Sequence, residues 1–154
     1  MLLFLLVLLF INSLIAFVIY RILFKKRKMY NDRFAMIMSM SISGVLSMNC
    51  AMIMQFLFTI DMVNIVVFTI IIGGCMGIFF GSLVKFQSVL SGFTHGVTGS
   101  LMGNMLGVVI KDPTICSLPA TYLASVEENM IIFSLFGTAL VISTISLVHY
   151  SLKV

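Results

Sequence analysis

The segment from Val89 to Ile110 constrains the fold most. It has about 22 residues and no charged side chain, and at 1.5 Å rise per residue this length crosses a bilayer core of about 30 Å. In lipid a glycine face lets a second helix backbone approach closely, whereas each interior glycine weakens a helix in water by about 1 kcal/mol. We therefore expect a buried transmembrane helix whose glycines, at about 100° per residue, share an arc of about 80°: Gly92, Gly96, Gly99, Gly103 and Gly107.

The composition is that of an integral membrane protein. Of the 154 residues 61% are hydrophobic and 9% are charged, and the mean hydropathy is +1.22. A soluble domain of this size needs more polar material to cover its surface. The net charge of +4 comes mostly from one run beside a membrane segment, which indicates membrane topology and not nucleic-acid binding.

The chain is expected to be one all-α domain, a polytopic transmembrane helical bundle of about five helices. The first segment carries its basic residues after the apolar stretch, and no cleavage site follows, so it is predicted to be a retained anchor and not a signal peptide. The predicted spans in the domain 1–154 are 2–24, 34–58, 64–84, 89–110 and 130–150, with an outer loop at 111–129.

The positive-inside rule orients these spans. With the N-terminus outside and the C-terminus inside, eight of the nine basic residues fall on the cytoplasmic side, and only Lys111 lies outside. The opposite orientation reverses this bias. We therefore expect a multi-pass protein of the cell membrane, with a bacterial plasma membrane as the setting.

Two more stripes of small residues predict close helix packing. The second segment has small residues at every fourth position, and the third has glycines within about 60° on one face. Because a short turn joins the third and fourth segments, these two are expected to form an antiparallel hairpin. The predicted packing residues outside the fourth segment are Ser39, Ser43, Ser47, Gly74, Gly77 and Gly81.

Sulfur and imidazole groups at membrane depth give a second, chemical hypothesis. Thioether, thiolate and imidazole ligands select soft Cu(I), and intramembrane ionisable residues are functional candidates. The alternative is that methionine and cysteine fill gaps in the core and that the histidine bonds to a neighbouring helix. The candidate metal ligands are Cys50, Met54, Cys75, His95, Met102 and Met105.

Enzyme motifs are missing from the sequence. It has no nucleotide loop, no HExxH and no carboxylate pair within a span. The adjacent Glu127 and Glu128 precede the last span, where the helix dipole favours them. The sequence thus predicts neither an enzyme nor a cofactor, apart from the Cu(I) hypothesis.

Three runs resemble a loose group of small, mostly uncharacterised Gly/Met-rich membrane proteins of Gram-positive bacteria. They are MSMSISGVLSMNCAMIMQF, IIGGCMGIFFGSL and LSGFTHGVTGSLMGNMLGVVI. The resemblance covers roughly Arg33 to Asp112 and the final helix, and it implies a membrane bundle without an established activity. His95, Val97, Thr98 and Asn104 stand where the group has more Met, Gly or Ala.

Two functions follow from these features. The first is a structural or accessory subunit, in which small-residue faces dock copies of the chain or a larger membrane partner. The second is a small transporter or channel, in one version for a soft metal ion such as Cu(I), with residues 34–110 lining the transport path. In both cases the partners are the lipid bilayer and other membrane protein, and no nucleic acid is expected.

Overall fold

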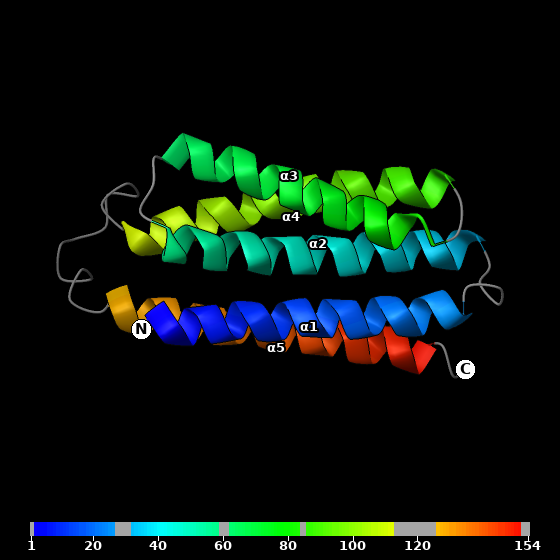
Figure 1. Ribbon diagram of the computed structural model, residues 1–154, viewed down its shortest axis with the longest axis horizontal. Helices are drawn as coiled ribbons and strands as arrows, with labels where there is room; N and C mark the ends of the chain where they lie inside the picture. The colour runs from blue at the N-terminus through cyan, green and yellow to red at the C-terminus, as the bar shows by residue number, and fades with distance from the viewer. Residues whose placement is uncertain (1, 27–31, 59–61, 84–85, 113–125, 152–154) are drawn as a thin grey trace.

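The protein is a bundle of five helices in the part of the chain that the computed structural model describes, residues 2–26, 32–58, 62–83, 86–112 and 126–151 (Figure 1). Most of the predicted outer loop, residues 113–125, lies outside this part. The helices are α1 (Leu2–Lys26), α2 (Asp32–Leu57), α3 (Met62–Gly81), α4 (Phe86–Lys111) and α5 (Val126–Ser151).

Four of these helices, α1, α2, α3 and α5, are long and apolar enough to cross a membrane. An all-helical membrane protein is therefore supported, as the composition predicts. α4 is as long as α2 and α5, at 26 residues, but its glycine, serine and threonine lower its hydropathy, and it is not among the four.

The helix ends differ from the predicted spans by a few residues. α5 begins at Val126, four residues before the predicted start at Met130, because Glu127 and Glu128 occupy its first turn, where carboxylates meet the positive end of the helix dipole. α3 ends at Gly81, three residues early, where Ser82 continues only as a turn with its N–H donating to the carbonyl of Ile78 at 2.8 Å.

The helices lie side by side, with α2 in the middle of the bundle (Figure 1). α3 and α4 pack on one side of α2, and α1 and α5 pack on the other. Each helix runs opposite to the one before it in the chain, so α2 and α4 are parallel neighbours, and α1 begins at the opposite end of the bundle from the end of α5.

The α1/α5 side is joined to α2 by large apolar side chains in two clusters. One cluster lies toward the end where α1 stops, and its buried members include Ile19, Leu23, Ile42 and Val141. The other lies toward the end where α1 begins, and its members are Leu5, Leu8, Met52, Ile53, Phe56, Ile110 and Met130.

Candidate functional site

The glycine faces of α3 and α4 are in direct backbone contact. A Cβ atom added at Gly92 would collide with the carbonyl oxygen of Gly77, and one added at Gly96 would collide with that of Gly73. At Gly81 the added atom would lie 2.6 Å from the carbonyl oxygen of Ser88. In these pairs the residue number on α4 rises as the residue number on α3 falls. The two backbones therefore run antiparallel, as in the hairpin that the sequence predicts.

The other side of the same glycine arc lies against α2. A Cβ at Gly99 would collide with the carbonyl oxygen of Gly44, and one at Gly103 with that of Met48. Here the paired numbers rise together, so α2 and α4 run parallel. α4 thus uses one arc of small residues to contact two helix backbones at once.

The serine stripe of α2 bonds to α4 across this interface. Ser43 Oγ donates to the carbonyl oxygen of Gly92 at 3.1 Å. One turn earlier the hydroxyls of Ser39 and Ser88 lie 3.0 Å apart, and Ser88 also donates to the carbonyl oxygen of Ala35 at 3.3 Å. Interhelical hydrogen bonds in membranes contribute about 0.6 kcal/mol each on average, so these serines fix the register of two helices whose main attraction is close packing.

Asn104 provides a similar link between α4 and α3. Its Nδ2 donates to Thr69 Oγ1 at 2.6 Å and to the carbonyl oxygen of Ser100 at 2.9 Å. Asn104 and Thr69 are both buried. The amide therefore serves as a helix contact, which the sequence did not single out.

Two of the six candidate metal ligands lie on α2. Cys50 is buried in the bundle. Met54, one turn further along, is half-buried and borders a cavity of about 370 Å³ between α2 and α3. This pair keeps the spacing expected from the sequence, but Cys50 lies in the packed interior, whereas Met54 borders the N-terminal end of α3.

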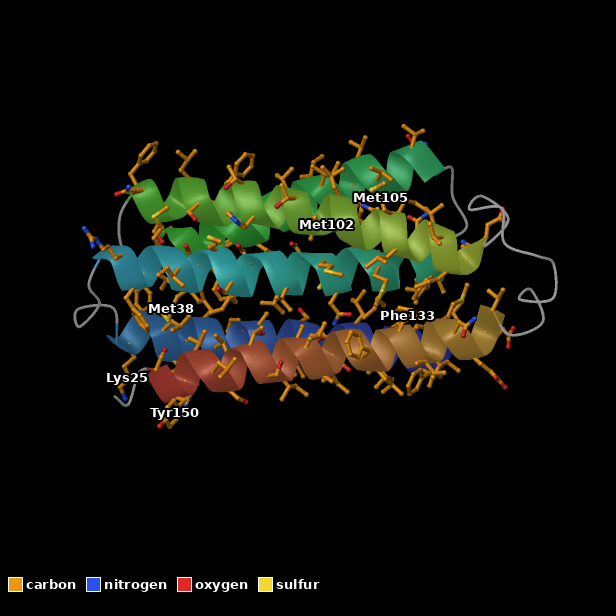
Figure 2. The ribbon with its side chains drawn as sticks, turned by 180° about the vertical axis from the view of Figure 1, so that it is seen from behind. Lys25, Met38, Met102, Met105, Phe133 and Tyr150 are labelled. Atoms are coloured by element: carbon orange, nitrogen blue, oxygen red, sulfur yellow. The ribbon has the colours of Figure 1, made fainter. Side chains whose placement is uncertain are left out.

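Three other candidates lie on the outer surface. Cys75 on α3 is exposed, and Met102 and Met105 on α4 are 61% and 72% exposed. Figure 2 shows the two methionines one after the other along α4. Their side chains are exposed on the outside of the bundle, whereas Cys50 is buried inside it.

The two cysteines also differ in their level along the bundle. Gly73 and Gly77 face Gly96 and Gly92, so Cys75 between them is level with about residue 94 of α4, whereas Cys50 is level with Gly103. Nine residues at 1.5 Å rise put about 13 Å between these levels. One ion held by both sulfurs needs them within about 5 Å of each other. A single chain therefore does not bring the six candidates together, and in its described part no three His, Cys, Asp or Glu side chains gather at one point.

His95 has its hydrogen-bond partner on its own helix and not on a neighbouring one. Its Nδ1–H donates to the carbonyl oxygen of Ser91 at 3.0 Å. The residue is half-buried, and its Cβ would lie 3.8 Å from a Cβ added at Gly44 of α2. In this position the imidazole packs at the edge of the α2/α4 interface.

Two buried amides mark the α1/α2/α5 side. Asn12 is completely buried on α1 between the two apolar clusters; its Nδ2 donates to the carbonyl oxygen of Leu8 at 2.9 Å, and its Oδ1 has no partner among the described residues. Asn49 on α2 is 3% exposed, and neither of its amide atoms has a partner in that part of the chain. A Cβ at Gly137 of α5 would collide with Asn49 Oδ1. The sequence analysis did not identify Asn12 as a candidate, although it is the only amide in the long apolar stretch 2–24.

The end of α2 is capped from α4. Lys111 Nζ donates to the carbonyl oxygens of Phe58 at 3.0 Å and Gln55 at 3.4 Å. Carbonyls at a helix C-terminus lack partners within the helix and attract cations. The one basic residue that the positive-inside rule assigns to the outer side thus has a structural partner there.

Comparison with known proteins gives no match to a family model, to a curated protein or to a solved structure.

Proposed function

We propose that the chain is a structural or accessory subunit of a membrane assembly, built either from several copies of itself or around a larger membrane partner. In this proposal all five helices cross the membrane, with the N-terminus outside and the C-terminus inside. It is not proposed as an enzyme.

The proposal that α4 also crosses rests on its position. It lies side by side with α2 and α3 (Figure 1) and contacts their backbones from Gly92 to Gly103. The orientation is supported by the charges: Arg21, Lys25 and Arg33 lie at the end of the bundle proposed to be inside, whereas Glu127 and Glu128 lie at the other. This is the distribution that the positive-inside rule favours.

The observation that carries the assembly proposal is the outward face of α4. Of the five described helices, only α4 is not among those apolar enough to cross a membrane, yet a full stripe of its residues is exposed. Thr94, Thr98, Leu101 and Met105 follow one another at spacings of four, three and four, the spacing that lines up one side of a helix. All four are exposed, and Met105 is exposed by 72%.

This stripe fits a protein partner better than lipid alone. Small and hydroxyl side chains are enriched where transmembrane helices meet, and methionine adapts its shape to irregular surfaces. The glycine arc of α4 is occupied by α2 and α3 of the same chain. A partner would therefore contact the threonine and methionine face and not the glycines.

The alternative function, transport of a soft metal ion, has no comparable support within one chain. The α3/α4 interface is filled by backbone at Gly77 and Gly92. Cys75, Met102 and Met105 could join one site only between copies, because they lie on the outside. Disulfide cross-linking at position 105 therefore also tests whether this part of α4 meets a second copy.

The test is disulfide cross-linking in native membranes. In a variant with all three native cysteines changed to serine, Thr98→Cys and Met105→Cys are each oxidised with a mild catalyst. The matched control is Ile142→Cys, since Ile142 is 52% exposed on α5. We expect the α4 cysteines to form disulfide-linked species and the control to stay monomeric.

The mass of the linked species distinguishes the two forms of the proposal. Twice the chain mass indicates a homo-oligomer, and another mass indicates an accessory subunit whose partner mass spectrometry can identify. If all three positions remain monomeric, or if the control links as well as the α4 positions do, the assembly proposal is overturned.

A further inference from the structure

Neither the packing nor the proposed function explains a groove that lies between α1 and α5. Its volume is about 420 Å³. It is lined by the last turns of α1 and α5, the two helices that lie on the opposite side of α2 from α3 and α4 (Figure 1). The lining residues are Ile19, Ile22, Leu23, Ile145, Ser146, Val148, His149 and Tyr150.

The groove is apolar along its length and polar at one end. The isoleucines and Val148 form its walls, whereas His149 and Tyr150 lie where α5 ends. Lys25 on α1 lies at the same end of the bundle as Tyr150 (Figure 2). From Ile19 to Lys25 the helix rises about 9 Å at 1.5 Å per residue. The groove is therefore a short apolar slot, and its polar end lies at the end of the bundle that carries Lys25.

The charges near this end of α1 have one sign. Arg21 and Lys25 are both exposed. In the sequence the basic run 25–28 overlaps the end of α1. Basic clusters directly beside a transmembrane helix attract anionic lipids, and basic pockets between helices on the cytoplasmic side bind their head groups.

We propose that this groove binds one anionic phospholipid of the inner leaflet. The acyl chain lies against Ile19, Ile22 and Ile145, and the phosphate accepts hydrogen bonds from Lys25 Nζ and from the polar groups of His149 or Tyr150. Phosphate and acyl chain match the two ends of the groove in charge and polarity. The inference rests on the membrane orientation proposed above but not on the accessory role, so cross-linking through α4 and lipid binding here fail independently.

The test is native mass spectrometry of the full chain purified in mild detergent. The protein is mixed with equal amounts of dioleoyl phosphatidylglycerol and dioleoyl phosphatidylcholine. We expect one retained lipid per chain, with the anionic lipid in excess. Because one basic residue near a membrane surface changes binding by about five-fold, Lys25→Gln is expected to lower retention of phosphatidylglycerol by about that factor.

Two further variants locate the site. Arg33→Gln removes an exposed charge from α2, a helix that contributes no lining residue to the groove, and it is expected to leave retention unchanged. Ile145→Phe fills the slot and is expected to displace the lipid, with an unchanged helical circular dichroism spectrum as the folding control. Equal retention of the two lipids, or equal effects of Lys25→Gln and Arg33→Gln, would overturn the proposal.

Discussion

Replacing Gly96 by alanine tests the close contact between α3 and α4 directly. The added methyl group would meet only backbone: the carbonyl oxygen of Gly73, its carbonyl carbon at 3.0 Å and the Cα of Gly77 at 3.4 Å. No side chain can rotate away to make room. The two helices must therefore separate, and a gap of 0.5–1 Å forfeits about a quarter to a half of each dispersion contact that it opens.

Gly44→Ala is the matched control for this substitution. Gly44 also lies inside a helix and faces α4, but its added Cβ would lie 3.8 Å from the nearest atoms of His95, an ordinary contact distance. Both substitutions gain the same helix propensity, about 1 kcal/mol in water. The difference between the two variants therefore isolates the steric cost, which for overpacking is about 1–3 kcal/mol.

The assay is thermal unfolding of the detergent-solubilised protein, followed by circular dichroism. At about 3 °C per kcal/mol for a chain of this size, the Tm of the Gly96→Ala variant should lie about 3–9 °C below that of Gly44→Ala. The reasoning is refuted if the two variants have the same Tm, or if Gly96→Ala is the more stable one.

Two further substitutions test polar groups in the bundle. Ser43→Ala removes the 3.1 Å hydrogen bond to the carbonyl oxygen of Gly92 and should lower the free energy of unfolding by about 0.6 kcal/mol. The control is Ser41→Ala, whose hydroxyl donates to the carbonyl oxygen of Ile37 on its own helix, and it should leave the free energy of unfolding unchanged. Equal losses in the two variants would contradict an interhelical role for Ser43. Asn49→Leu replaces a buried amide that lies next to Gly137 and has no hydrogen-bond partner among the described residues. It should raise the free energy of unfolding by about 1–3 kcal/mol. A lower Tm would instead mean that a bound molecule or partner satisfies the amide.

The sequence predicted the helices well because each apolar segment is long and its ends carry charge or turn residues. It also predicted which face of α4 packs, since Gly92, Gly96 and Gly99 share an arc. It could not predict that α2, and not α1 or α5, packs beside α4. A stripe such as Ser39 and Ser43 has the same spacing whichever helix it contacts. Which helix it contacts depends on the register of the backbone contacts, and the spacing does not contain that information.

The sulfur residues show what a list of residue types leaves out. On a wheel of 100° per residue Met105 lies about 160° from the centre of the glycine arc, so packing through the glycines turns its side chain outward. The structure has Met105 exposed and Cys50 buried. The rotation of α4 about its axis could therefore be predicted from the sequence. The level of Cys50 relative to Cys75 could not be predicted, because it depends on two helix interfaces.

The bundle combines two kinds of helix association that respond differently to lipid. Lipid tails are as apolar as leucine, so apolar side chains gain little by leaving them, and close backbone packing becomes the stronger attraction. α2, α3 and α4 associate in that stronger way, through Gly77, Gly92 and Gly103. α1 and α5 are attached to α2 by large apolar side chains such as Leu8 and Val141, which lipid can replace. The groove between α1 and α5 therefore lies where the proposed lipid can most change the packing, whereas the exposed face of α4, the proposed partner surface, belongs to the closely packed part of the bundle.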